Sequence, residues 1–261
     1  MTGARLEGRV AIITGASRGA GLVLAERFAR EGARVMLVGR RADALAEAAA
    51  AIGDRALACV ADVTKEADVA AAIDRAIDVF GQVDILVNNA AAPGQDRYIW
   101  EQTLENWNAT LAIDLTAAML CTREVLNRSM LARRTGAILN LSSTAGYAGI
   151  ARKSHYATAK AALRTFTKSV AIEVGAYGIR CNCIVPGRID TQLYRDWIAR
   201  RAAEQGEDAE VLGATELARL PLRTLSTPDD IANLALFLAS DDSRTITGQS
   251  INCDSGAVMA G

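Results

Sequence analysis

Short apolar runs alternate with longer amphipathic segments along almost the whole chain, and this alternation constrains the fold more than any other feature. Strands are predicted at 9–15, 33–39, 55–62, 82–90, 136–143, 179–187 and 248–256. Helices are predicted at 21–32, 42–53, 66–81, 107–131, 155–176 and 228–240. Regular strand–helix alternation predicts an α/β fold, with a doubly wound parallel sheet covered by helices on both faces. In such sheets ligands bind beyond the carboxyl ends of the strands.

Composition narrows the class of protein. The 261 residues are 51% hydrophobic, and no Pro/Gly/Ser-rich linker divides them, which predicts one large domain over 1–261. A net charge of -1 disfavours nucleic-acid or anionic-membrane partners. The absence of a signal-like N-terminus and of a long apolar run predicts a cytoplasmic protein. Five cysteines argue against a disulfide framework, and Cys181 and Cys183 lack partners for a metal site, so no metal is expected.

A glycine-rich stretch, "TGASRGAG" at 14–21, separates the first predicted strand from the first predicted helix. Gly15 suits a tight turn, Gly19 lets the backbone approach a pyrophosphate, and Gly21 lets the helix pack closely on the sheet. The N-terminus of the helix offers free N–H groups and partial positive charge to phosphates. This stretch therefore predicts nucleotide binding, although the spacing is G-x-x-x-G-x-G rather than the commoner G-x-G-x-x-G.

The end of the second predicted strand indicates which nucleotide binds. An acidic residue there would accept hydrogen bonds from a ribose 2′-hydroxyl, but this chain has Arg40 and Arg41. Two arginines at a helix start oppose the helix dipole, and a bound 2′-phosphate would remove that conflict. Arg18 in the glycine loop could reach the same phosphate. The sequence therefore favours NADP(H), with NAD(H) and solvated surface arginines as the alternative.

Tyr156 and Lys160 are four positions apart, so on a helix they share one face. A phenol with a pKa near about 10 is a poor proton donor at neutral pH, but a nearby ammonium group favours the phenolate. Ser142 and Ser143 end a predicted strand at the same sheet edge as the glycine loop. This combination predicts a tyrosine that transfers a proton, a lysine that activates it and binds the nicotinamide ribose, and a serine hydroxyl that orients the substrate oxygen.

These motifs together resemble the short-chain dehydrogenase/reductase family over essentially the whole chain. The matching segments, in the family's order, are "TGASRGAG", "ADV" at 61–63, "NNA" at 88–90, Ser143, "YATAK" at 156–160 and "PGRIDT" at 186–191. The C-terminal stretch is similar to that of 3-oxoacyl-carrier-protein reductases and related alcohol dehydrogenases. The resemblance implies a seven-stranded parallel sheet, oxidoreductase activity on ketones and secondary alcohols, and a homotetramer or homodimer that uses the long helices and the last strand as interfaces.

The resemblance also implies roles for individual residues. Tyr156 would be the general acid/base, Lys160 its activator and Ser143 the substrate-orienting residue. The implied cofactor-binding residues are Gly15, Ser17, Arg18, Gly19, Ala20, Gly21, Arg40, Asp62, Val63, Asn89, Ala90, Tyr156, Lys160, Gly187, Ile189 and Thr191. Asp114 stands where the family usually has asparagine, whose backbone carbonyl holds a proton-relaying water. We retain Asp114 as a catalytic candidate, since its carboxylate would attract Lys160 or alter nearby pKa values.

The substrate is not identified by the sequence. Residues 188–226 resemble the substrate-covering loop of the family, and their apolar residues Leu193, Tyr194, Trp197, Ile198, Leu212 and Leu217 suit short amphipathic helices. Arg152 and Lys153 could attract an anionic substrate group, although a solvent-exposed position is favoured. The alternatives to an NADP(H)-dependent reductase are an NAD(H)-dependent dehydrogenase of a sugar or cyclic alcohol, a dehydratase or epimerase on the same scaffold, and a catalytically weak nucleotide-binding regulatory protein.

Overall fold

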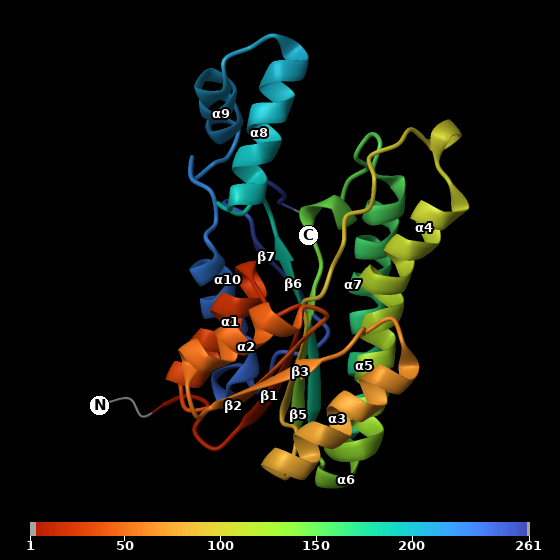
Figure 1. Cartoon of the computed structure of the whole chain (residues 1–261), viewed down its shortest axis with the longest axis vertical. Coiled ribbons are helices and arrows are strands. Elements are labelled where there is room, and N and C mark those ends of the chain that lie inside the picture. Colours follow the sequence, from red (N-terminus) through yellow and green to blue (C-terminus); the bar gives the residue numbers. More distant parts are fainter. Residues whose placement is uncertain (1–3, 260–261) are drawn as a thin grey trace.

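Seven parallel strands form one sheet in the order β3-β2-β1-β4-β5-β6-β7 (Figure 1). The structure is a computed structural model that describes residues 4–259. The strands are β1 Val10–Thr14, β2 Arg34–Gly39, β3 Ala56–Val60, β4 Ile85–Asn88, β5 Gly136–Leu141, β6 Ile179–Pro186 and β7 Ser250–Cys253. The main helices are α1 Gly19–Arg30, α2 Ala42–Ile52, α3 Glu66–Phe80, α4 Leu104–Leu111, α5 Ala117–Val125, α6 Leu131–Arg133, α7 Ser154–Val174, α8 Gln192–Gln205, α9 Ala209–Ala218 and α10 Pro228–Ala239. The doubly wound parallel sheet predicted from the alternation is confirmed.

Two apolar layers fill the space between the sheet and its helices. Side chains alternate along each strand, so Ile13 packs with α1, α2 and α10, whereas Ile12 packs with α3, α5 and α7 on the other face. Figure 1 shows the same division, with α1, α2 and α10 on one side of the sheet and α3, α4, α5 and α7 on the other. Both faces are therefore buried, which explains why the strands are almost continuously apolar.

The long helical segment in the middle of the chain differs from its prediction. We expected one helix over 107–131, but helical structure runs from Leu104 to Arg133 and includes two π-helical turns, at Ala112–Thr116 and Leu126–Met130. Each π turn widens the helix locally, a feature common at functional sites. The first π turn contains Asp114, so the irregularity lies next to a candidate catalytic residue.

The strand order changes direction between β1 and β4. Both strands are hydrogen-bonded in parallel, with Ile12 opposite Leu86, while the chain continues from β1 to β2 on one side and from β4 to β5 on the other. The loops at their carboxyl ends consequently diverge and leave a crevice. Thr14 links the end of β1 to the loop after β4, because its hydroxyl accepts hydrogen bonds from the N–H groups of Asn89 and Ala90, both at 3.0 Å.

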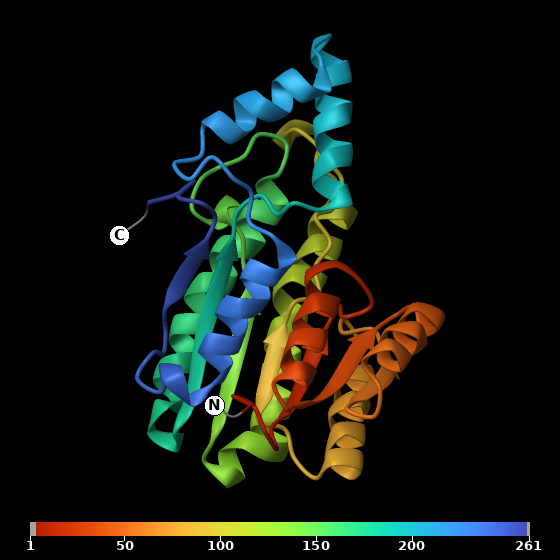
Figure 2. The same cartoon turned by 90° about the vertical axis from the view of Figure 1, so that its left-hand side faces the viewer.

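Helices α8 and α9 project beyond the carboxyl edge of the sheet (Figures 1 and 2). We call residues 192–218 the lid. A small apolar cluster of Ile198, Ala202 and Leu212, with Tyr194 and Trp197 against it, holds the two helices together. The short helices expected in this segment are present as α8 and α9, but Leu193 is 73% exposed rather than part of their apolar face. Within residues 4–259, no helix combines the length and the apolar character needed to cross a membrane.

Candidate active site

The glycine loop occupies the carboxyl end of β1, and its glycines are required by space and by backbone conformation. Gly15 has φ +68°, and a Cβ there would lie 2.9 Å from the Cα of Ala90. A Cβ on Gly21 would lie 2.4 Å from the Asn89 amide nitrogen and 2.6 Å from the Gly15 carbonyl oxygen. Gly19, at φ +58°, has no neighbour within 4 Å of its position for a Cβ, which leaves its backbone open to a ligand.

The N-terminus of α1 fits a phosphate group. Its N-cap residue, Arg18, makes no side-chain capping hydrogen bond, and the first turn contains no acidic residue. The partial positive charge at this end is therefore not neutralised by the chain. Together with the open backbone of Gly19, these features suit the pyrophosphate of a dinucleotide.

The arginines predicted to select the nucleotide lie beside this loop. Arg40 and Arg41 are exposed just beyond β2, and Arg41 donates a hydrogen bond of 3.1 Å to the Ser17 hydroxyl in the glycine loop. Asp62 follows β3 on the same edge, where the Thr64 hydroxyl donates to it at 2.8 Å and, with Arg40 as a minor contributor, lowers its pKa. Val63 next to it is buried. The structure thus gathers the candidate adenosine-binding residues from three loops.

Tyr156 and Lys160 lie on one face of α7, as predicted from their spacing. The Lys160 ammonium nitrogen is 5.6 Å from the centre of the Tyr156 ring and donates a hydrogen bond of 3.1 Å to the Leu141 carbonyl at the end of β5. The Ser142 hydroxyl donates to the Lys160 carbonyl at 2.7 Å. Lys160 is buried and Tyr156 is partly exposed, so the lysine is fixed while the phenol remains accessible.

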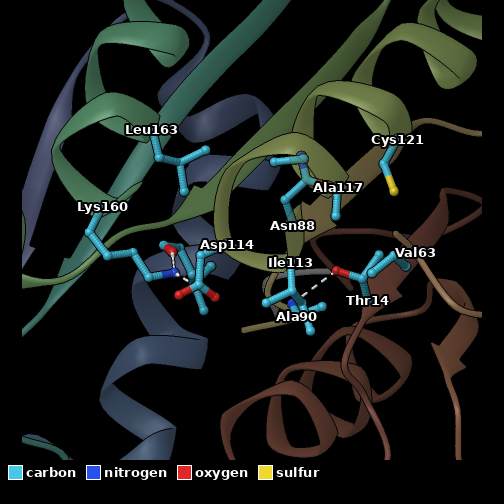
Figure 3. A pocket seen from close by; sticks show the side chains of 12 residues that line it. Thr14, Val63, Asn88, Ala90, Ile113, Asp114, Ala117, Cys121, Lys160 and Leu163 are labelled. Atoms are coloured by element: carbon cyan, nitrogen blue, oxygen red, sulfur yellow. Dashed lines mark hydrogen bonds and ion pairs between the residues drawn. The ribbon is translucent and has the colours of Figure 1, made fainter. Parts of the chain in front are cut away.

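Asp114 is the buried partner of Lys160. One carboxylate oxygen lies 3.9 Å from the Lys160 ammonium nitrogen (Figure 3). The same oxygen accepts a hydrogen bond of 2.9 Å from the Ala92 N–H. The other oxygen has no hydrogen-bond partner in the described chain. Burial raises the pKa of Asp114, although the Lys160 ammonium and the Ala92 N–H act in the opposite direction. The side chain, and not only the backbone, therefore faces the candidate site.

A small polar cavity lies behind this pair. It leaves about 10 Å³ for the centre of a water molecule, which is room for about one water. Figure 3 shows Asp114 and Lys160 beside each other at one part of the cavity, with Asn88 and Thr14 also on its wall. The Asn88 side-chain oxygen has no partner within residues 4–259, like the free oxygen of Asp114. The residues that line the cavity thus include two with an unpaired acceptor oxygen, Asn88 and Asp114, and the second of these lies next to the Lys160 ammonium group.

Ser143 follows β5 and caps a short 3₁₀ helix, Thr144–Gly146. Its hydroxyl oxygen accepts a hydrogen bond of 3.2 Å from the Ala145 N–H, which leaves the hydroxyl hydrogen available to donate. Gly146 packs tightly against α7, since a Cβ there would lie 2.8 Å from the Lys160 carbonyl carbon. The Ser143 loop and the Tyr156–Lys160 pair are therefore held together by close packing.

The loop after β6 completes the predicted site and supports the lid. Gly187 is close to the last strand, where a Cβ would lie 2.7 Å from the Asp254 Cβ. Ile189 bridges to Ser226, and the Thr191 side chain caps α8 by accepting from the Tyr194 N–H. Arg188 forms an ion pair with the buried Glu216 of α9. These contacts anchor the lid above the carboxyl edge of the sheet.

Sequence reasoning missed several residues that hold the site together. Thr14 joins β1 to the loop after β4, and the buried His155 ring lies 3.0 Å, through Nε2, from the Pro93 carbonyl. The Asn88 and Asn140 side chains bond at 2.8 Å across neighbouring strands. The sequence offered a signal only for Thr14, which directly precedes the glycine loop. The other contacts join segments that are far apart in the sequence, and no local pattern predicts them.

The fold and the site define the class of protein. A doubly wound sheet carries a glycine loop and an uncapped helix N-terminus at the point where the strand order reverses. A tyrosine–lysine pair and a serine lie at the same edge of the sheet. This arrangement is typical of a dinucleotide-dependent enzyme.

Comparisons with known proteins give the same class. A family model described as Enoyl-(Acyl carrier protein) reductase matches residues 15–258. Cis-4-hydroxycyclohexanecarboxylate dehydrogenase of Sinomonas cyclohexanicum is 39% identical over 250 residues, covering 95% of this chain and 96% of that protein. Galactitol 2-dehydrogenase of Agrobacterium fabrum is 38% identical over 260 residues, covering 98% of this chain and 100% of that protein. The crystal structure of NAD⁺-bound xylitol dehydrogenase superposes with a TM-score of 0.90 at 29% identity, covering 97% of this chain and 100% of that one.

This chain belongs to the short-chain dehydrogenase/reductase family. It is an oxidoreductase that acts on alcohols or ketones, and its fold implies a nicotinamide nucleotide cofactor. The expected family and class of enzyme are confirmed.

Proposed function

We propose that this enzyme interconverts a ketone and a secondary alcohol with NADP(H), using Tyr156 as the general acid/base. The observation that carries the proposal is the accessible Tyr156 ring, 5.6 Å from the buried Lys160 ammonium nitrogen and on the same sheet edge as the glycine loop. The bound nicotinamide supplies or accepts the hydride. The chain positions the substrate and moves the proton.

Each side chain has a defined task in this proposal. Ser143 donates its free hydroxyl hydrogen to the substrate oxygen and holds it near the phenol. Lys160 would bind the nicotinamide ribose beside the phenol and is itself fixed by the Leu141 carbonyl. Asp114 keeps Lys160 paired within the buried cavity. The cavity lined by Lys160 and Asp114 has room for about one water, which would exchange protons with this pair.

Cofactor preference rests on Arg40 and Arg41. Both are exposed beyond β2, where the ribose of a dinucleotide bound at the glycine loop would lie. Arg41 reaches Ser17 in that loop, and Arg18 in the loop is also exposed, so three cations surround the expected 2′-phosphate. This charge favours NADP(H).

A second candidate is an NAD(H)-dependent dehydrogenase of a sugar or cyclic alcohol. The structural neighbour bound to NAD⁺ is a xylitol dehydrogenase, and two relatives act on galactitol and on cis-4-hydroxycyclohexanecarboxylate, as their names state. Activity with both cofactors on polyols, cyclic alcohols and ketones separates this candidate from the first.

We also propose that 188–226 covers the substrate and that copies of the chain assemble through α5 and α7. The lid projects above the site, held at its base by Arg188 and Glu216. Ile172 on α7 is 83% exposed and Met119 on α5 is 37% exposed, which suits burial against a second copy.

The test follows the absorbance of reduced nicotinamide, with NADPH or NADH and a panel of ketones, and with NADP⁺ or NAD⁺ and a panel of alcohols. We expect turnover with NADPH, and a loss of about 100-fold to 10,000-fold in kcat for Tyr156→Phe, the range that general acid–base catalysis contributes. NADPH affinity should be retained in this variant, measured by fluorescence titration. Full activity of Tyr156→Phe would refute the assigned role, and tight cofactor binding without turnover on the panel would favour a regulatory nucleotide-binding protein.

A further inference from the structure

The loop after β4 is fastened to the π turn that contains Asp114 and to the start of α7. Asp114 accepts a hydrogen bond from the Ala92 N–H at 2.9 Å, and the His155 ring lies 3.0 Å from the Pro93 carbonyl. Further along, the Arg97 N–H donates to the Arg152 carbonyl at 2.9 Å. We call the two joined segments, 92–97 and 150–153, the site wall. Because Tyr156 lies in the first turn of α7, this wall is held beside its ring.

Lys153 extends from this wall to Tyr156. It is the N-cap residue of α7, and its ammonium nitrogen lies 5.9 Å from the centre of the Tyr156 ring. Its only ion-pair partner within residues 4–259 is Asp96, at 2.9 Å. The side chain of Lys153 is 25% exposed, whereas that of Lys160 is 3% exposed. Tyr156 therefore faces two ammonium groups, of which Lys160 is enclosed and Lys153 can be reached by a substrate.

The charge of the site wall is unbalanced. It contains three cations, Arg97, Arg152 and Lys153, and one acidic residue, Asp96. The first turn of α7 contains no acidic residue, so the partial positive charge of the helix end adds to this excess. One carboxylate cannot neutralise the group, so a second anion would be bound favourably next to Tyr156.

Apolar side chains lie next to these cations. Tyr98 and Trp100 stack with their ring centres 4.7 Å apart, and the Arg152 guanidinium lies 5.7 Å from the centre of the Tyr98 ring. Trp100 is 77% exposed and Ile150 is 44% exposed. A molecule with an apolar body and a single anionic group would match both the apolar and the cationic parts of this surface.

We propose that Lys153 binds an anionic group, such as a carboxylate, on the alcohol or ketone substrate, and that Asp96 is its exchangeable counter-ion when no substrate is bound. The inference rests on the proposed function, because it assumes that the reacting oxygen lies at Tyr156. It assigns the substrate class as secondary alcohols or ketones that carry a negative charge and an apolar body. Lys153 acts as a specificity-determining residue, since neutral ketones would reach Tyr156 without it.

Matched substrate pairs test this assignment. The probes are 4-oxocyclohexanecarboxylate with 4-oxocyclohexanecarboxamide, and 4-oxopentanoate with 4-oxopentanamide, each reduced by the holoenzyme. The measured quantity is the selectivity, defined as kcat/KM for the carboxylate divided by kcat/KM for the amide. We expect the wild type to prefer the carboxylate. Lys153→Gln should lower the selectivity about tenfold or more, because a charge-assisted hydrogen bond is lost only with the anionic probe.

Asp96→Asn provides the opposite perturbation. It removes the competing counter-ion while Lys153 remains, so the selectivity should rise above that of the wild type. If the pair serves only to hold the two segments of the wall together, both variants would instead lose activity equally on both members of a pair. Lys168→Gln, at an exposed position further along α7, controls for the loss of a lysine and should keep the wild-type selectivity.

Each outcome decides between two conclusions. Opposite shifts in the two variants support the assignment. A wild-type selectivity near or below one, or an unchanged selectivity in Lys153→Gln, would overturn it even if the neutral ketones are reduced with dependence on Tyr156. No reduction of either member of any pair, or of the wider ketone panel, would overturn the proposed function itself, and the inference with it.

Discussion

The buried Asp114–Lys160 pair predicts how the free energy of unfolding changes with pH, and the direction of that change follows from the structure. At 3.9 Å the two charges attract by about 4 kcal/mol with an effective dielectric constant of about 20. Burying a carboxylate costs several kcal/mol, so the two contributions nearly cancel at neutral pH. The amide of Asp114→Asn can still accept from the Ala92 N–H. We therefore expect a small change in the free energy of unfolding at any single pH, and the informative quantity is its dependence on pH.

Burial raises the pKa of Asp114 in the folded chain above its value in the unfolded chain. Between those two pKa values the folded protein holds a proton that the unfolded protein has lost. The contribution of this carboxyl to stability is therefore complete below the unfolded pKa and is lost as the pH rises through the folded pKa. The loss is about 1.4 kcal/mol for each unit by which the pKa is raised. Asparagine has no such dependence, so Asp114→Asn should gain stability relative to the wild type as the pH rises.

Urea unfolding of the cofactor-free protein, followed by tryptophan fluorescence from about pH 2.5 to about pH 7.5, measures this difference and includes the acid range in which Asp62 titrates. Asp62→Asn is the matched control. The Thr64 hydroxyl lowers the pKa of Asp62, so the stability contributed by this carboxyl increases as the pH rises, opposite to that of Asp114. That variant should lose stability relative to the wild type as the pH rises. A difference between Asp114→Asn and the wild type that stays constant, or that changes in the same direction as for Asp62→Asn, would show that burial does not control the titration of Asp114.

Two further variants test the cofactor site. Arg40→Asp should lower the ratio of kcat/KM for NADPH to kcat/KM for NADH by about tenfold or more, because it replaces a charge that attracts the 2′-phosphate by one that repels it. An unchanged ratio would show that Arg40 does not contact the 2′-phosphate. Gly21→Ala should destabilise the fold by about 1–3 kcal/mol and weaken cofactor binding, because its Cβ would lie 2.4 Å from the Asn89 amide nitrogen. Gly213→Ala in α9 has no neighbour within 4 Å and should instead stabilise by about 0.5–1 kcal/mol; denaturation midpoints that do not separate the two variants would contradict the packing argument.

Much of this enzyme follows from the order of its residues alone. Strand–helix alternation determines the parallel sheet, since strands buried on both faces must be apolar throughout and helices must cover them. The positions of Gly15, Gly21, Tyr156 and Lys160 relative to those elements place them at one edge of the sheet, because all parallel strands end there. One turn of α7 separates Tyr156 from Lys160 and brings them together, since residues four apart on a helix are neighbours.

Contacts between segments that are far apart in the sequence follow only from the tertiary structure. The sequence suggested that the Asp114 carboxylate would attract Lys160, but only the structure shows the π turn that places the two groups 3.9 Å apart. The sequence also gives no sign that Lys153 pairs with Asp96 beside Tyr156. A lysine three residues before a tyrosine has no fixed direction until a loop from another strand packs against it. The periodicity of the sequence identifies only neighbours within one helix or strand. The charged groups of this site come from separate loops, which meet at the sheet edge where the strand order reverses.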